Sequence, residues 1–224
     1  MLFSEGDITQ IVQSKDTLEL FSGEGAFYLL DDIQIGKRFK LNAGLRASFA
    51  GGDSSEYFAL EPRLSANLLL KKQNSLKFGY SKMSQFIHRV SSSNFVLPTD
   101  MYYPVTQNVK PLNSNQIFLS YTKNYTDKKV LLTIEVYQKW LYNLIEFREG
   151  SKVFLDNNFE DKLVRGTGSS AGIEFLLRKD EGKIFGWISY TFAVTTRQFD
   201  SINSGEIFYA RNDRRHNFSA VGIA

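Results

Sequence analysis

Apolar and polar side chains take turns along most of the chain, and this period of two restricts the fold more than any other feature. In residues 40–49 every second position is Leu, Ala or Phe, and the positions between are Lys, Asn, Gly, Arg and Ser. Similar alternation recurs at 63–70, 76–81, 132–139 and 173–178. Because successive side chains of a β-strand point to opposite faces, the pattern predicts strands with one apolar and one polar face.

The pattern predicts about nine antiparallel strands and no helix. Most of them exceed the roughly 5–6 residues of an ordinary globular strand. They are long enough to cross a bilayer at a tilt, which takes about 9–11 residues. The expected ranges are 24–36, 39–50, 58–70, 74–86, 114–125, 130–147, 167–179, 183–198 and 213–224. Residues 1–23 give no clear pattern.

The expected connections alternate between short and long. The short ones are 36–38, 72–74, 126–129 and 179–182, and the longer ones are 51–55, 87–113, 148–166 and 199–212. In an up-and-down barrel every second connection lies on the same rim, and outer-membrane barrels keep tight turns on the periplasmic rim and long loops outside. The sequence therefore predicts an all-β, antiparallel, up-and-down transmembrane barrel.

The polar face carries charged residues at many positions along the expected strands. They are Lys40, Arg46, Arg63, Lys77, Glu135, Glu174 and Arg178. A Lys or Arg that faces lipid at the bilayer midplane costs about 2–4 kcal/mol. We therefore expect the polar face to line a hydrated interior and the apolar face to contact lipid. Alternation alone would also fit a soluble all-β binding module with its apolar face inside, and strand length with loop sorting favours the barrel.

The expected strand count indicates an incomplete barrel. Single-chain bacterial barrels use even strand numbers, and an open sheet edge in lipid leaves backbone groups unpaired at several kcal/mol each. The last strand stops in mid-pattern at Ala224, and residues 1–7 show no signal peptide. We expect residues 1–224 to form one partial barrel domain, an internal or truncated segment of a longer protein, without a plug domain.

Short segments in a characteristic order run through residues 24–224. They are LNAGLR at 41–46, EPRLS at 61–65, SLKFGYS at 75–81 followed by MSQ at 83–85, Lys110-Pro111 with Ser114 and Gln116, EVYQK at 135–139, GTGSSAGIE at 166–174, GWISYT at 186–191 and NDRRH at 212–216. Together they resemble the C-terminal half of the barrel of TonB-dependent receptors, in the form common among Bacteroidetes.

The resemblance implies a location and a function for the parent protein. Such receptors lie in the bacterial outer membrane, where a barrel closed by an N-terminal plug imports a scarce nutrient such as a siderophore, cobalamin or a glycan. The implied partners are outer-membrane lipid, the extracellular nutrient and the TonB complex, reached through an N-terminal part that this chain lacks. A surface lipoprotein is a further candidate. No cofactor and no enzymatic activity are implied.

The best candidate for ligand contact is the expected extracellular loop at 94–104, and within it Asp100, Tyr102 and Tyr103. Prolines in this loop reduce the entropy lost when it orders, and tyrosines combine broad contact area with a polar tip. The alternative is a loop that folds on itself. Four other aromatic residues are expected to form interface girdles or packing contacts instead. They are Tyr137, Trp140, Tyr142 and Trp187.

Other chemistry finds little support in the sequence. The chain has no cysteine, and its two histidines, His88 and His216, are expected near the outer rim without an assembled metal site. Asp213 beside His216 could imitate the rim site of a small outer-membrane enzyme. Ser169-Ser170 lacks the nucleophile-elbow pattern, and Gly166 and Gly168 around it are expected to let the chain bend into a strand. A net charge of +3 without a basic run gives no reason to expect nucleic acid.

Overall fold

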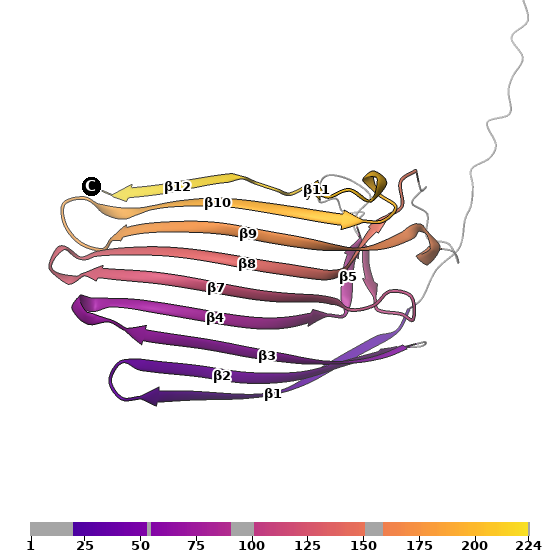
Figure 1. Cartoon of the computed structure of the whole chain (residues 1–224), viewed down its shortest axis with the longest axis horizontal. Coiled ribbons are helices and arrows are strands. Elements are labelled where there is room, and N and C mark those ends of the chain that lie inside the picture. The colour runs from indigo at the N-terminus through magenta and orange to yellow at the C-terminus, as the bar shows by residue number, and fades with distance from the viewer. Residues whose placement is uncertain (1–19, 53–54, 91–100, 151–158, 224) are drawn as a thin grey trace, which may run out of the picture.

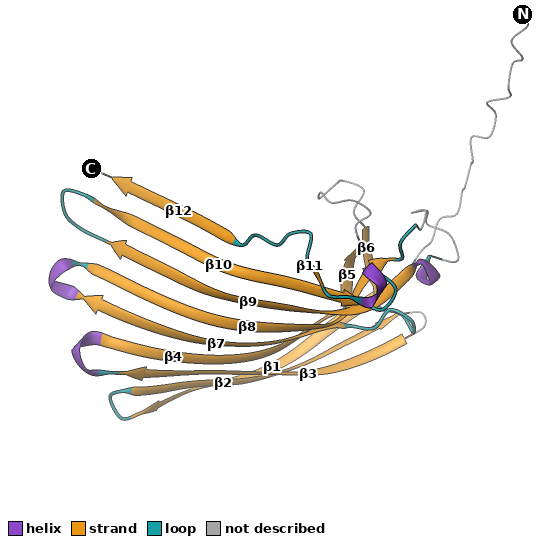
Figure 2. Cartoon of the chain, turned by 45° about the horizontal axis from the view of Figure 1, so that its top comes forward, coloured by secondary structure: helices purple, strands orange, loops and turns teal. Residues whose placement is uncertain are grey.

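The computed structural model describes residues 20–52, 55–90, 101–150 and 159–223. Their long strands form a single curved antiparallel sheet in the order β1-β2-β3-β4-β7-β8-β9-β10 (Figures 1 and 2). β11 and β12 both pair with β10. Within the described ranges no helix is long and apolar enough to cross a membrane.

Nine long strands confirm the predicted set to within a few residues at each end. Their bounds are Ser22–Ile35 (β1), Phe39–Gly52 (β2), Ser55–Leu69 (β3), Asn74–Gln85 (β4), Leu112–Tyr125 (β7), Val130–Phe147 (β8), Leu163–Lys179 (β9), Phe185–Phe199 (β10) and His216–Ile223 (β12).

The sequence pattern did not predict three short strands. β5 (Ile87–Val90) and β6 (Met101–Pro104) form a separate hairpin, and β11 (Phe208–Tyr209) adds a short pairing to β10. Four single-turn 3₁₀ helices complete the described elements, at Lys71–Gln73, Thr126–Lys128, Glu160–Lys162 and Asn203–Gly205.

Tight turns lie together at one end of the sheet, on the left of Figure 1, and join β1 to β2, β3 to β4, β7 to β8 and β9 to β10. The opposite end carries the β5–β6 hairpin and the longer connections. The connection between β2 and β3 is shorter than expected. Gly51, Gly52 and Ser55 belong to the strands, where Gly52 pairs with Ser55, so only residues 53–54 lie between.

Cross-strand register gives the sheet two continuous faces. One row of direct partners runs from Lys40 through Asn67, Lys77, Ser120, Glu135 and Glu174 to Thr191. The neighbouring row on the other face runs from Leu41 through Ala66, Phe78, Leu119, Val136 and Ile173 to Phe192. All seven predicted polar-face charges share the face of the first row, which we call the polar face. The opposite one is the apolar face.

The apolar face is open rather than buried. Leu29 is 80% exposed and Phe58 is 68% exposed, although both point with the apolar rows. A soluble module would bury such a face to gain roughly 25 cal/mol for each Å² removed from water. In the described part of the chain the buried apolar residues instead cluster near the long-loop end. The sheet therefore has the surface of a barrel wall without a soluble core.

The apolar band shifts along the strands, as tilt requires. On β3 it continues beyond Leu64 through Pro62 and Leu60 to Phe58. On β4 it ends at Tyr80, the partner of Leu64, and Lys82 follows on the same face. Strands tilted by about 35–45° cross the lipid at successively different positions in their sequence. The shift between neighbouring strands has this form.

The four expected girdle aromatics divide between the two faces. Trp140 and Tyr142 lie on the apolar face toward the long-loop end, where an interfacial girdle is expected. Tyr137 and Trp187 lie on the polar face, and the Tyr137 ring covers Gly172 on the neighbouring strand. The first pair fits a membrane interface and Tyr137 fits a packing contact.

Glycines on the polar face make room for aromatic rings rather than for bends. Gly166 and Gly168 lie inside β9, contrary to the expected bend at its start. The ring of Phe199, which is 1% exposed, occupies the space over Gly166. Phe118 covers Gly79 in the same way. An added Cβ would overlap the Gln198 backbone oxygen and the Phe199 ring at Gly166, and the Phe118 ring at Gly79.

We expect Gly166→Ala to lower the free energy of unfolding by about 1–3 kcal/mol, the usual cost of an overpacked site. The added Cβ would overlap both the Gln198 backbone oxygen and the Phe199 ring. Urea unfolding of the protein in lipid vesicles measures the change. Gly23→Ala is the control, because a Cβ there meets nothing within 4 Å. Equal losses in both variants would contradict the packing argument.

Candidate functional site

The segment between β4 and β7 folds back over the polar face of the sheet. Phe86 and Val105 are buried together with Ala50 of β2. Tyr57 and Ala59 of β3 pack against them, and all three wall residues lie on the polar face. The Tyr57 hydroxyl donates to the Thr106 carbonyl at 2.6 Å. The polar face is therefore partly covered at its long-loop end.

A fully buried carboxylate fixes the position of this segment. Glu61 is 0% exposed and accepts hydrogen bonds from Arg46 at 3.3 Å, from Ser48 at 3.2 Å and from the Ser84 backbone N–H at 2.8 Å. β3 and β4 are paired only as far as Arg63 and Ser81. Beyond this point the Ser84 amide needs another acceptor, because an unpaired buried backbone group is costly. Glu61 supplies it, and Arg46 neutralises Glu61.

A hollow of about 340 Å³ opens between the wall and the folded segment, and we call it the upper hollow. Glu24, Arg46 and Gln85 line it from the wall, and Ile87 and Tyr102 line it from the folded segment. The Tyr102 side chain is 75% exposed. The predicted ligand residue Tyr102 therefore lines the same hollow as Arg46, which the sequence alone did not indicate.

The predicted residue Tyr103 points the other way. It is 5% exposed and packs with Val90, Val109 and Phe159. Adjacent residues of a strand face opposite sides, so only one of the two tyrosines can line the upper hollow. Asp100, the third predicted residue, lies outside the described residues.

Glu160 ties two connections together and was missed in the sequence. It accepts hydrogen bonds from the Tyr103 hydroxyl at 2.9 Å, the Thr106 hydroxyl at 2.6 Å and the Asn108 amide at 2.7 Å. Tyr103 lies in β6, and Thr106 and Asn108 lie between β6 and β7. Glu160 lies just before β9. A glutamate far along the chain gives no local signal of such a contact.

Both members of the Tyr103–Glu160 pair have shifted acidities. Burial, followed by the hydrogen bond to Glu160 and the charge of Glu160, raises the pKa of Tyr103, which therefore stays a donor. Burial acts to raise the pKa of Glu160, but hydrogen bonds from Thr106, Asn108 and Tyr103 outweigh it and lower this pKa. The stabilisation from Glu160 is thus complete above the ordinary carboxyl range and is lost as pH falls through its lowered pKa.

His88 makes the same hairpin sensitive to acid. Its Nε2 lies 3.0 Å from the Lys110 carbonyl oxygen. Burial lowers the pKa of His88 below 6.5, and the hydrogen bond to Lys110 only partly opposes this effect. In an opened hairpin His88 would have its ordinary pKa of about 6.5, so it would bind a proton at a higher pH than the buried His88 does. The closed hairpin therefore loses stability relative to the opened one as pH falls through that range.

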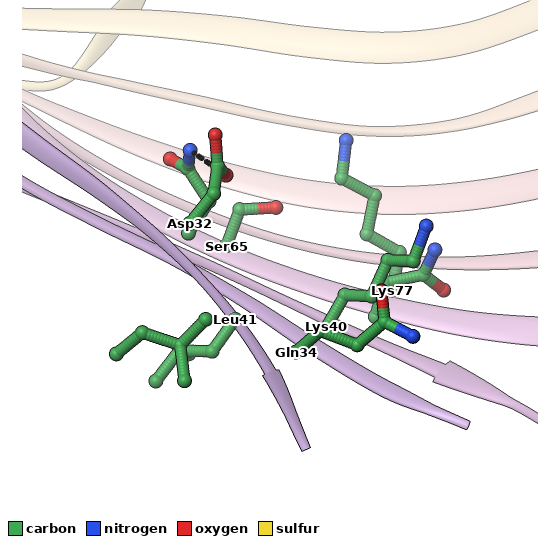
Figure 3. Close-up of a pocket in the computed structure, with 9 residues that line it drawn as sticks. Asp32, Gln34, Lys40, Leu41, Ser65 and Lys77 are labelled. Atoms are coloured by element: carbon green, nitrogen blue, oxygen red, sulfur yellow. Dashed lines mark hydrogen bonds between the residues drawn. The ribbon is translucent and has the colours of Figure 1, made fainter. Parts of the chain in front are cut away.

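A second hollow of about 360 Å³ lies on the polar face nearer the tight-turn end, and we call it the lower hollow (Figure 3). Its polar lining residues are Asp32, Gln34, Lys40, Asn42, Ser65, Asn67 and Lys77. Asn42 donates to Asp32 at 2.6 Å. Leu41 points to the opposite side of the sheet in Figure 3. Two lysines flank Asn67 in register, so this hollow has a cationic lining.

The histidines and the rim charges play separate structural parts. The His216 ring Nδ1 lies 2.7 Å from the Tyr190 hydroxyl. Asp213 accepts hydrogen bonds from Arg215 and from the Thr195 backbone N–H, both at 2.7 Å, which matches the expected rim charge cluster. Across the described ranges, no group of three or more His, Asp or Glu is arranged to hold a metal ion.

An open antiparallel sheet with a polar face, an apolar face and tight turns at one end defines a segment of a transmembrane barrel wall. Residues 7–223 match the family model described as TonB dependent receptor-like, beta-barrel. The chain belongs to this family, and its place is the bacterial outer membrane. The polar face is accordingly the lumenal wall and the apolar face meets lipid.

Solved structures agree on the fold. In the FpvAI–pyocin S2 complex the match has a TM-score of 0.64 at 12% identity, covering 90% of this chain and 26% of the other. The FrpB iron transporter from Neisseria meningitidis gives 0.60 at 10%, covering 84% and 28%. The ferripyoverdine receptor of Pseudomonas aeruginosa gives 0.62 at 11%, covering 90% and 26%.

The chain spans about a quarter of the length of these structures. Identities this low establish a shared fold and leave the ligand open. The comparison with curated proteins gave no match.

We expect Glu160→Gln to loosen the folded segment at pH 7. A hydrogen bond to a charged group contributes about 1.5–3 kcal/mol, and the variant weakens three of them. Hydrogen–deuterium exchange should therefore quicken by roughly tenfold or more in residues 101–111. Asp161→Asn, in the same turn and exposed, is the control. Unchanged exchange in the Glu160 variant would show that Glu160 does not hold the segment.

Proposed function

We propose that this chain forms part of the barrel wall of a receptor that imports a scarce nutrient across the outer membrane. The main support is the upper hollow, which Arg46 lines from the lumenal wall and Tyr102 lines from the inward-folded segment. A siderophore, cobalamin or a glycan are the candidate nutrients. The energy would come from the TonB complex, acting through parts of the receptor outside this chain.

The predicted ligand residues take different parts in this proposal. Tyr102 would contact the nutrient directly, because its side chain is exposed toward the upper hollow. Tyr103 would act indirectly by holding the hairpin through Glu160. Asp100 stays a proposed contact residue without a described position. A surface lipoprotein and outer-membrane lipid remain the further proposed partners.

Receptor function is a better account of the chain than catalysis. The family and the similar structures are receptors and transporters. Asp213 is engaged by Arg215 and His216 by Tyr190, so neither is arranged to activate a serine. We therefore propose that the chain contributes binding and passage of a nutrient and no chemical step.

Growth of a deletion strain tests the proposal. Cells lacking the full receptor should grow poorly in one medium in which iron, cobalamin or a single glycan is limiting, and the intact receptor should restore growth. Tyr102→Ala should raise the nutrient concentration for half-maximal uptake by about tenfold, equivalent to about 1.4 kcal/mol. Tyr125→Ala, at the tight-turn end of β7, serves as the control. Normal growth of the deletion strain in every medium would refute import.

A further inference from the structure

We propose that the tight-turn end of the wall binds the anionic headgroups of phospholipids in the periplasmic leaflet of the outer membrane. This surface, which we call the basic rim, consists of the four tight turns on the left of Figure 1 with three flanking residues on each side. Its segments are 33–41, 67–76, 123–132 and 177–187. The proposal concerns how the wall sits in the membrane, and it does not depend on the import of a nutrient.

Positive charge is concentrated in the basic rim. Of the 27 Lys and Arg residues of the chain eleven lie in the rim, against three of its 24 Asp and Glu residues. Two of these three carboxylates already have a partner inside the rim. Asp180 pairs with Arg178 at 2.8 Å, and Glu181 pairs with Lys129 at 3.8 Å. The rim therefore keeps a large positive excess, although the remainder of the chain is net negative. Such an excess favours an anionic partner.

Two lysines of the basic rim lie on the apolar face, where the wall meets lipid. Lys123 of β7 pairs with Leu132, and Lys179 of β9 pairs with Val130. On both strands the following positions of this face, toward the middle of the sheet, are apolar or aromatic. Lysine tolerates such a place because its aliphatic stem contacts acyl chains while its ammonium group reaches the headgroups. Both lysines thus stand at the margin of the lipid-contacting band.

The ammonium groups of both lysines extend toward the turns. The Lys123 Nζ lies 4.6 Å from the centre of the ring of Tyr125, the last residue of β7. The Lys179 Nζ lies beside Gly182 in the turn between β9 and β10, 3.2 Å from the place of an added Cβ. Within the described part of the chain, neither ammonium has a carboxylate at ion-pair distance. Each charge is therefore available to a phosphate group at the membrane surface.

The position of these lysines favours a lipid over a soluble acidic protein. A soluble partner below the rim can reach exposed turn residues such as Lys37 and Lys183, but Lys123 and Lys179 extend from the lipid-contacting face. A phospholipid reaches both sets, because its headgroup lies level with the turns and its acyl chains contact the apolar face. Lysine binds a phosphate group as a point charge. A lipid with net negative charge gains more from the rim than a zwitterionic lipid, whose own amine offsets its phosphate.

Retention of lipid by the purified full-length receptor tests the proposal. The receptor is reconstituted in nanodiscs of equal phosphatidylglycerol and phosphatidylethanolamine and extracted in mild detergent, and mass spectrometry measures the lipids that stay bound. We expect phosphatidylglycerol to be enriched by about fivefold, the effect of one lysine near an anionic surface. The double variant Lys123→Gln/Lys179→Gln should lose most of this enrichment. About 1 M salt should reduce the enrichment in the natural receptor, because the screening length falls to about 3 Å.

Lys40→Gln/Lys77→Gln is the matched control, because it removes the same charge near the same end of the wall but from the polar face. This control should keep the enrichment. No enrichment in the natural receptor, or an equal loss in both double variants, would overturn the proposal. Polyglutamate serves as a soluble acidic probe. If polyglutamate bound to the receptor through Lys123 and Lys179 while phosphatidylglycerol was not enriched, the rim would belong to a soluble acidic partner, and the proposal would fail.

Discussion

Backbone pairing in lipid is the constraint on which the rest of the structure depends. No water reaches the membrane interior, so each N–H and C=O must find a partner on a neighbouring strand. Antiparallel ladders meet this demand from β1 to β10. Where the ladder opens between β3 and β4, above Arg63, the Glu61 side chain replaces the missing strand for Ser84. The most buried charge of the described wall thus sits where regular pairing stops.

Continuous pairing also sorts the side chains. The register places polar residues opposite polar ones across seven strands, from β2 to β10, and it leaves the other face of the sheet free to contact lipid. The upper hollow forms because the segment after β4 bends onto the polar face, and Phe86 and Val105 anchor it there. A candidate binding site therefore arises from a departure from the barrel pattern, held in place by buried apolar contacts and by Glu160.

Alternation revealed the nine long strands and both faces, since a period of two depends only on the local chain. Alternation does not predict the hairpin of β5 and β6, because residues distant in sequence, such as Tyr57 and Glu160, hold this region in place. Adjacent side chains of a strand point to opposite faces, and this rule could have predicted that Tyr102 and Tyr103 face opposite sides. The local sequence around Gly166 predicts a bend, because the Phe199 ring that fills the space over this glycine belongs to the next strand.

Site-specific labelling of Leu64→Cys and Ser65→Cys tests the two-faced wall most directly. The natural chain has no cysteine, so each variant carries one thiol. In the full receptor in native outer membranes, Leu64→Cys should react with a lipid-soluble maleimide and resist a charged one. Ser65→Cys, lining the lower hollow, should react with the charged reagent. The reverse pattern, or equal reaction of both positions with the charged reagent, would contradict a wall between lipid and a hydrated lumen.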